Sequence, residues 1–204
     1  ETNTVELDAK GMEVKKVAIV KGAANTDLKY QYDGMVLKIT LDKKYKGGEK
    51  YTLYIDYVAK PDELEVQGSA AITDAKGLYF VNPKGEDKNK PIQIWTQGET
   101  EATSVWCPTI DRPNQKTTQE IYMTVPDKYV TLSNGKLTSQ KKNTDGTRTD
   151  YWKMEQPHAP YLFFMGVGDY AVIKDSYKGK EVSYYVEREY AGVARKIFGN
   201  TPEM

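Results

Sequence analysis

The sequence predicts an all-β protein with a short helical segment near its C-terminal end. Three observations support this fold class. Apolar and polar residues alternate with a period of two in many short runs, as half-buried strands require. Turn-forming dipeptides such as Asn134-Gly135 and Asp145-Gly146 separate some of these runs. Apolar residues at helical spacing, by contrast, occur after Tyr190.

The first 60 residues contain four runs with strand character. Residues 5–7 and 12–20 form the first two, with a turn between them. Residues 35–41 and 51–57 alternate cleanly and are joined by a basic loop, which predicts a hairpin with one buried face. The polar residues 25–34 between the second and third runs are predicted to form turns.

The middle of the chain is less regular. Residues 64–66 and 77–81 are candidates for short strands, and residues 82–90 read as a solvated loop. A clearer strand runs through residues 92–97. The period of two is then lost at Gly98.

The later part of the chain returns to strand patterns. A strand is predicted to start at Gln119, and Asn134-Gly135 predicts a tight type I′ turn. Asp145-Gly146 predicts the tip of a second hairpin. Residues 161–173 are the strongest apolar segment and predict a central strand, in which glycines indicate a bend or a close approach of backbones. The last strand is predicted at residues 181–186.

A short helix is predicted near the end of the chain. Gly199 is suited to cap it, and Thr201-Pro202 resembles the start of another helix. The expected domain organisation is therefore a β-rich domain over residues 1–190, followed at residues 191–204 by the start of a further, truncated domain. The apolar stripe of the helix consists of Tyr190, Val193, Ala194, Ile197 and Phe198.

Composition narrows the class of protein. The chain has 204 residues, of which 39% are hydrophobic, and this is typical of a folded globular protein. Lys plus Arg and Asp plus Glu both number 29, without a basic block, which argues against a nucleic-acid partner. The longest apolar run, residues 161–168, is far shorter than the ~20 residues of a membrane helix.

The scarcity of two residue types limits the chemistry. A catalytic zinc ion usually has three protein ligands drawn from His, Cys and carboxylates. This chain has one histidine, His158, and one cysteine, Cys107, so it cannot contain an HExxH motif or an internal disulfide. His158 lies between two prolines ahead of an apolar strand and is interpreted as structural. We therefore expect no metal site and no catalytic residue in this segment.

The stretch at residues 93–116 has the features of a site. It begins as a strand, stops at Gly98, and is followed at once by Glu99 and Glu101. Such an ending can place a carboxylate at the rim of a sheet, or the acids can simply be solvated, as most loop acids are. Glu101 is expected to be solvated. Asp111, beside an arginine and a proline, is expected to stabilise a turn or form an ion pair.

Several motifs in this stretch and beyond resemble those of one enzyme family in their order. The motifs are WTQGE at residues 95–99, CPTIDRPNQK at residues 107–116, VPDKY at residues 125–129, LSNG at residues 132–135, PYL at residues 160–162, GDY at residues 168–170 and FGNTPEM at residues 198–204. Their ordered set resembles the N-terminal domain of M1-family (gluzincin) zinc aminopeptidases, aminopeptidase N-like.

The resemblance implies a fold and a role. The fold would be a saddle-shaped all-β sandwich of large mixed sheets beside a catalytic domain of the same chain. That domain would hold the zinc ion and the Gly-x-Met-Glu-Asn motif, so the 204 residues alone would be inactive. Glu99 would bind the free α-amine of a peptide substrate, and Gln97 would line the pocket for its first side chain. The enzyme would remove single residues from peptide N-termini.

The resemblance has departures and leaves alternatives. Thr103, Ser104 and Val105 stand where many members have Ala-Arg-Arg, so any contacts of that basic pair do not transfer. A non-catalytic β-sandwich, serving as an interaction or carbohydrate-binding module, remains the alternative function. Relatives occur in the cytosol and in bacterial envelopes, so the compartment stays open.

Overall fold

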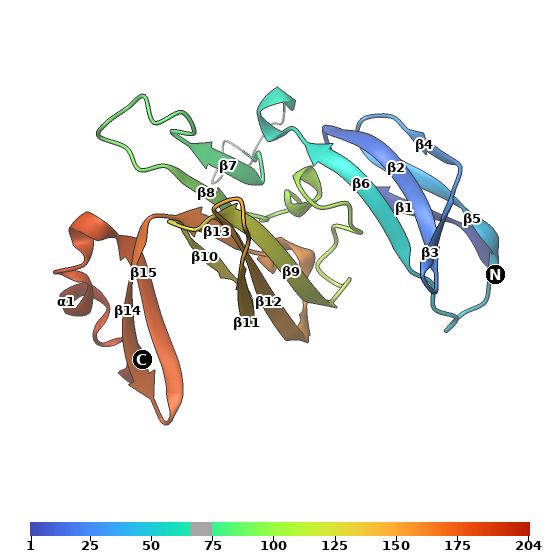
Figure 1. The fold of residues 1–204 in the computed structure, drawn as a ribbon. Helices are drawn as coiled ribbons and strands as arrows, with labels where there is room; N and C mark the ends of the chain where they lie inside the picture. The colour runs from blue at the N-terminus through green and yellow to red at the C-terminus, as the bar shows by residue number, and fades with distance from the viewer. Residues whose placement is uncertain (66–74) are drawn as a thin grey trace. The chain divides into compact units, whose positions relative to one another are not determined.

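Short antiparallel strands make up most of the computed structural model, which describes residues 1–65 and 75–204 (Figure 1). The fold class is all-β, as predicted. The sheets contain two to four strands and are smaller than the large mixed sheets that the resemblance implies. The chain divides into two units. The first unit comprises Glu1–Tyr79, Thr96–Gln119 and Met154–Phe164, and the second comprises Phe80–Trp95, Glu120–Lys153 and Met165–Met204.

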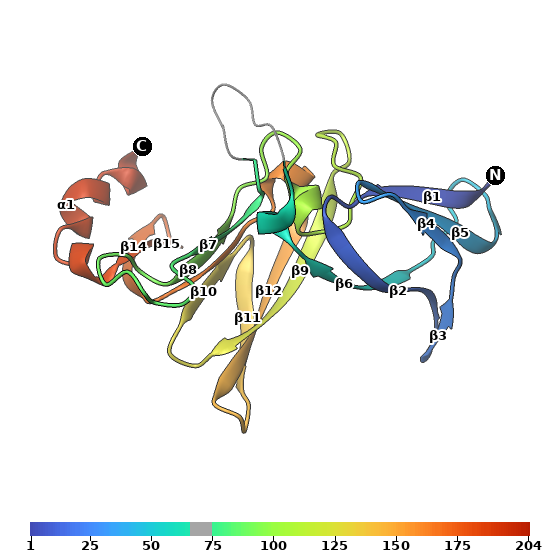
Figure 2. The same cartoon turned by 90° about the horizontal axis from the view of Figure 1, so that it is seen from above.

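The first unit contains a sandwich of two three-stranded sheets, whose layers are visible in Figure 2. A buried apolar cluster joins the layers because it draws residues from β2 and from β5: Ala9, Met12, Val17, Leu37 and Ile39. The first sheet has the order β1 (Thr2–Asp8), β5 (Val36–Tyr45) and β4 (Tyr30–Tyr32), and the second has the order β3 (Ala24–Asp27), β2 (Met12–Lys21) and β6 (Leu53–Ala59).

The hairpin predicted from residues 35–41 and 51–57 is wrong. Both strands exist and each turns one face to the core, but β5 pairs with β1 and β4, whereas β6 pairs with β2. The connection at residues 46–52 is long enough to carry the chain from one layer to the other. Alternation indicates which face of a strand is buried, but it does not identify the neighbouring strand.

Two further predictions in this unit need correction. Residues 25–34, predicted as turns, contain the short edge strands β3 and β4, whose side chains are mostly exposed. Edge strands without an apolar face give no alternating signal. The strand predicted at residues 64–66 does not form at Leu64 and Glu65, which follow a 3-10 turn at Pro61–Glu63, and Val66 lies outside the described residues.

The second unit contains most of the remaining strands, although β7, β8, β9 and β12 share residues with both units. Its buried cluster consists of Met123, Val125, Trp152 and Val167. One sheet has the order β10 (Val130–Ser133), β13 (Met165–Gly168), β8 (Gln93–Thr96) and β7 (Leu78–Val81), and another has the order β11 (Lys136–Lys142), β12 (Thr147–His158) and β9 (Thr117–Pro126).

The two predicted tight turns have different outcomes. Asp145-Gly146 lies at the tip of the hairpin between β11 and β12, as expected. Asn134-Gly135 does not close a hairpin, because β10 pairs with β13 and β11 pairs with β12. A type I′ turn needs positive φ at both central residues. Only Gly135 has it, since the described non-glycine residues with positive φ are Asn82 and Lys178.

The apolar segment at residues 161–173 is divided and does not form one strand. A 3-10 turn at Pro160–Leu162 precedes β13, and β14 (Tyr170–Tyr177) begins beyond Gly168. The central position holds for β13, which lies between β10 and β8. A Cβ atom at Gly168 would lie 2.8 Å from the ring of Tyr170. The glycine therefore marks a close approach, as predicted, and the chain changes sheets there.

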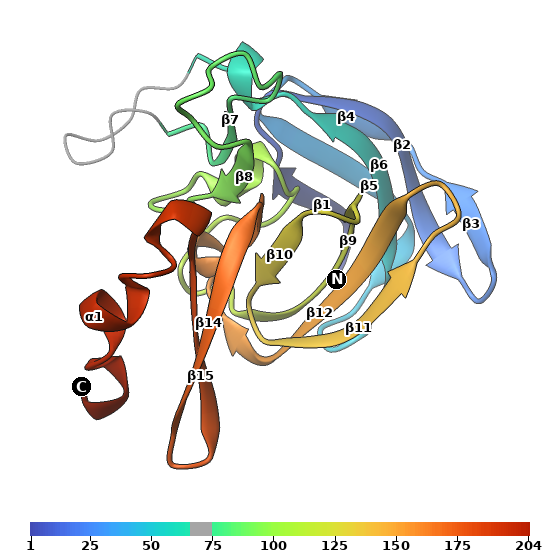
Figure 3. The same ribbon diagram turned by 60° about the vertical axis from the view of Figure 1, so that its left-hand side comes forward.

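The C-terminal residues lie against the hairpin of β14 and β15 (Lys180–Glu187), as Figure 3 shows. The predicted helix is α1 (Ala194–Phe198), with Gly199 as its C-cap. Only part of the predicted apolar stripe is buried, since Ala194 is fully buried whereas Ile197 is 63% exposed. Asn200, and not Thr201, occupies the N-cap position of the following 3-10 turn, Thr201–Glu203, without a capping hydrogen bond from its side chain.

Candidate functional site

The loop after β8 begins with a tight passage through Gly98. The backbone N–H of Gln97 donates to the carbonyl oxygen of Gly77 at 3.0 Å. A Cβ atom at Gly98 would lie 2.3 Å from Thr103 Oγ1 and 2.6 Å from the carbonyl oxygen of Tyr161. Because no side chain fits there, glycine is required where the strand pattern stops.

Residues 98–102 form a closed turn that carries Glu99. The N–H of Ala102 donates to the carbonyl oxygen of Gly98 at 2.9 Å, and the peptide bond between Glu99 and Thr100 is cis. A 3-10 turn at Thr103–Val105 follows. The hydroxyl of Thr103 donates to the carbonyl oxygen of Pro160 at 2.8 Å. The loop is therefore attached to the rest of the unit at both ends.

The two acids of this loop differ in whether they have an ion-pair partner. Glu99 is exposed and makes no hydrogen bond or ion pair with any residue that the structure describes. Glu101 Oε1 lies 2.7 Å from a guanidinium nitrogen of Arg112. Glu101 is exposed, as expected, and it also forms a surface ion pair with Arg112, in which each side chain is about half exposed. Glu99 remains as the uncompensated negative charge of the loop.

The side chain of Gln97 has a buried polar atom without a hydrogen-bond partner among the described residues. Its amide oxygen is buried and has no hydrogen-bond partner among the described residues, and the same holds for the indole nitrogen of Trp106. Leaving a buried polar atom unsatisfied costs about 1–3 kcal/mol, so such atoms in native proteins often mark a missing water molecule or ligand. The Gln97 oxygen can accept a hydrogen bond from an added donor, whereas Trp106 can only donate.

Other candidate residues have structural surroundings. Asp111 is 2% exposed, and its Oδ2 accepts the backbone N–H of Ser104 at 2.9 Å, which stabilises a turn as expected. His158 is buried beside Gln119, consistent with a structural role. Burial raises the pKa of the Cys107 thiol to about 11, which disfavours the nucleophilic thiolate.

The positions that depart from the family pattern also have a structural explanation. Thr103 and Ser104 are fully buried, as is Val105. Two long basic side chains could not be accommodated there without exposing them to solvent or leaving buried charges. Thr103 and Ser104 also contribute hydrogen bonds, to the carbonyl oxygen of Pro160 and to Asp111 Oδ2, which no local sequence pattern indicates.

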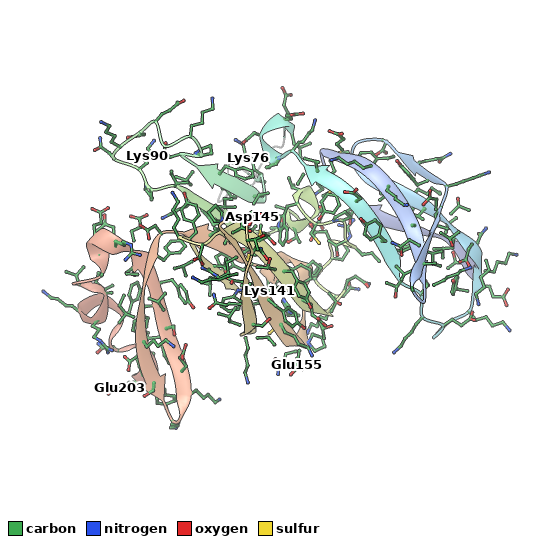
Figure 4. All side chains as sticks on the ribbon, viewed as in Figure 1. Lys76, Lys90, Lys141, Asp145, Glu155 and Glu203 are labelled. Atoms are coloured by element: carbon green, nitrogen blue, oxygen red, sulfur yellow. The ribbon has the colours of Figure 1, made fainter. Side chains whose placement is uncertain are left out.

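The second unit contains a surface depression that the sequence did not predict. Its volume is about 620 Å³, and its lining includes Lys90, Asp169, Glu187 and Arg188 (Lys90 is labelled in Figure 4). Several of these groups already have partners. Arg188 Nε lies 2.7 Å from Asp169 Oδ1, and Gln93 Nε2 donates to Glu187 Oε1 at 3.0 Å. The depression therefore lacks a strong preference for one sign of charge.

Within residues 1–65 and 75–204, no group of three or more His, Cys, Asp and Glu side chains could hold a metal ion. A zinc ion therefore has no matching ligand set in the described part of the chain. None of the helices described is long and apolar enough to cross a membrane.

Comparisons with known proteins identify the family and the fold. A family model, the peptidase M1 N-terminal domain, matches residues 1–162. A search of curated protein sequences gave no match. The M1 zinc metallopeptidase from Deinococcus radiodurans is similar in structure, with a TM-score of 0.71, 18% identity and coverage of 90% of this chain and 39% of its own.

A second solved structure supports the same fold. Legionella pneumophila aminopeptidase A, in complex with aspartic acid, matches with a TM-score of 0.70 and 19% identity, over 94% of this chain and 21% of its own. This chain thus spans between about a fifth and two fifths of the length of these two relatives. The resemblance seen in the sequence is confirmed: the chain belongs to the family of M1 peptidase N-terminal domains.

Proposed function

We propose that this chain is the substrate-binding N-terminal domain of a zinc aminopeptidase, and that Glu99 binds the α-amine of the peptide. The observation that carries the proposal is the contrast within one loop. Both acids are exposed, but Glu101 forms a surface ion pair with Arg112, whereas Glu99 has no partner among the described residues. A carboxylate held in a closed turn and left unpaired is suited to a cationic ligand.

The chemistry of such a contact explains removal of one residue at a time. A peptide α-amine has a pKa of roughly 8, so it is largely charged near neutral pH. An ammonium group and a carboxylate form a charge-assisted hydrogen bond, which is stronger than a neutral one. Because this contact holds the chain end, the bond to be cleaved lies at a set distance from it.

Gln97 is proposed to line the pocket for the first side chain. Its buried amide oxygen lacks a hydrogen-bond partner among the described residues, so a donor from the substrate or a bound water molecule would satisfy it. A relative from Deinococcus radiodurans, 16% identical, was crystallised as a variant bound to a Tyr-Ser-Ala substrate. This agrees with peptides as the partners of the present chain.

The zinc ion belongs, in this proposal, to a catalytic domain of the same chain. Within the part of the chain that the structure describes, no set of side chains could supply its ligands. Residues 191–204 are proposed to lead into that domain. Exposed apolar side chains such as Ile197 are consistent with a neighbour at this end. The 204 residues alone should neither hydrolyse peptides nor bind zinc tightly.

The test compares the two acids in the full-length protein. Glu99→Ala should lower kcat/KM for an aminoacyl reporter at least about 30-fold, since truncating one partner of a desolvated charge pair costs about 2 kcal/mol or more. Glu101→Ala is the matched control, because it removes an acid of the same loop that already has a partner. Equal, small effects of both variants would refute the assignment of Glu99. Lack of any peptidase activity in the full-length protein would favour the non-catalytic interaction or carbohydrate-binding module.

A further inference from the structure

The position of Glu99 depends on attachments outside its own turn. Regular structure ends at Thr96, the last residue of β8, and resumes at the 3-10 turn that begins at Thr103. A binding group has to be held to within about 0.5 Å of its productive position by supporting contacts. The contacts that hold residues 98–105 therefore bear directly on whether Glu99 can meet an amine.

Asp111 makes one of these contacts from a buried position. Its Oδ2 accepts the N–H of Ser104 at 2.9 Å, and both residues are almost completely buried. A buried N–H has little access to water, so it needs a protein acceptor. Ser104 is five residues beyond Glu99 and two residues beyond Ala102, where the turn that carries Glu99 closes.

A second layer of contacts connects Asp111 to the β-sandwich. The N–H of Asp111 donates to Asp8 Oδ2 at 2.9 Å. Asp8, at the end of β1, also exchanges two backbone hydrogen bonds with Thr109, of 2.8 and 3.0 Å. Residues 109–111 are thus held against the end of a strand whose own side chains contribute to the core of the sandwich.

The turn between β1 and β2 holds the loop as well. The N–H of Lys10 donates to the carbonyl oxygen of Ser104 at 2.8 Å. The ammonium group of Lys10 donates to the carbonyl oxygen of Glu101 at 2.6 Å. Ser104 is therefore held on both its N–H and its carbonyl side, by Asp111 and by Lys10.

We propose that Asp111 is a positioning residue for Glu99, and that it acts together with Asp8 to hold the amine-binding turn on the β-sandwich. Asp111 is 2% exposed, so its effect on a substrate is transmitted through Ser104 and the turn. This inference rests on the proposed role of Glu99. It assigns to Asp111 a function that ends when Glu99 is removed.

A double-mutant cycle in the full-length protein tests the inference. Asp111→Ala should lower kcat/KM for a free-amine aminoacyl reporter about tenfold, since residues coupled through shared contacts show clear interaction energies. In the Glu99→Ala background the same substitution should change kcat/KM less than about twofold. Asp111→Asn should retain activity within about twofold, because an amide oxygen also accepts the N–H of Ser104.

The outcomes separate this inference from the function on which it rests. Full activity of Glu99→Ala would overturn both. A large loss in Glu99→Ala, with equal effects of Asp111→Ala in the two backgrounds, would overturn only the positioning role, since a general structural defect does not depend on Glu99. If Asp111→Ala does not fold, Asp8→Ala takes its place in the cycle with the same expected coupling, and losses that multiply would again refute the role.

Discussion

Two buried aspartates, one in each unit, have different hydrogen-bond partners. Asp111 in the first unit accepts the backbone N–H of Ser104. Asp150 in the second unit is fully buried and lies 2.6 Å and 2.9 Å from two guanidinium nitrogens of Arg148. Thr131 and Gln140 donate further hydrogen bonds to it, of 2.6 and 3.0 Å. One carboxyl group is thus supported mainly by the backbone, and the other by a cation and two side chains.

The difference appears in the pKa values of the two groups. Burial raises the pKa of Asp111, and the hydrogen bonds from Ser104 do not compensate for it. Burial also raises the pKa of Asp150, but the hydrogen bonds from Arg148, Thr131 and Gln140 outweigh it and hold this pKa below its usual range. A buried acid is therefore favoured as a carboxylate only where a cation or several donors face it.

The largest expected effect comes from breaking the Asp150 network. Asp150→Ala should lower the free energy of unfolding by about 3 kcal/mol or more, because it leaves the largely buried Arg148 without its main partner. Chemical denaturation monitored by circular dichroism measures this loss. Asp127→Ala is a matched control, since Asp127 contacts the same guanidinium group but is more exposed, and its effect should be smaller.

A smaller effect is expected at Asp111, and it should depend on the substituent. Asp111→Ala should destabilise the protein by about 1–3 kcal/mol, because the buried N–H of Ser104 loses its acceptor. Asp111→Asn should be close to neutral, since it keeps an acceptor and removes a buried charge. Equal destabilisation by both variants, measured by thermal and chemical unfolding, would contradict the idea that the acceptor matters more than the charge.

The smallest expected effect is on the pH dependence of the free energy of unfolding. Asp111 and Asp150 should change this free energy in opposite directions as the pH rises. Asp150, with its lowered pKa, contributes stability that is present above the unfolded pKa of about 3.9 and is lost as the pH falls through its folded pKa. Asp111, with its raised pKa, makes the fold less stable as the pH rises from about 3.9 through its folded value.

Unfolding measured from pH 4 to 7 in two asparagine variants tests this sign. Relative to the unsubstituted protein, Asp111→Asn should gain stability as the pH rises through this range, because the wild-type carboxyl ionises at a cost. Asp150→Asn should remain less stable across the range, because its deficit is already present above the unfolded pKa. If the stability of the two variants changed with pH in the same way, the pKa values of Asp111 and Asp150 would not be shifted in opposite directions, and the proposed effect of Arg148 on Asp150 would be refuted.

Most individual strands could be predicted from the chain, whereas their partners could not. Residues 35–41 alternate because Leu37 and Ile39 face a core, and both are fully buried. The same pattern suits a hairpin or a sandwich layer, and β5 and β6 belong to different layers. The tight turn predicted at Asn134-Gly135 is wrong for the same reason, since a dipeptide indicates a local backbone preference and carries no information on which strands pair.

The candidate site was predicted from its motifs rather than from its geometry. The end of the strand pattern at Gly98 and the resemblance together led to Glu99 and Gln97. The pairing of Glu101 with Arg112 could not be inferred, because ten residues without a strand or α-helix separate them and loop acids usually remain solvated. Asp8 is 103 positions from Asp111, and no local pattern links them.

The chain by itself determined the all-β class, the buried faces of the strands, the end of the strand pattern at Gly98 and the motifs of the M1 N-terminal domain family. These features follow from the local periodicity of the sequence and from the order of short motifs, each of which can be recognised within a few residues. Tertiary structure alone decided which strands pair, which of Glu99 and Glu101 keeps an uncompensated charge, and what holds the loop. Those properties depend on contacts between distant residues, and such contacts exist only after the β-sandwich has brought them together.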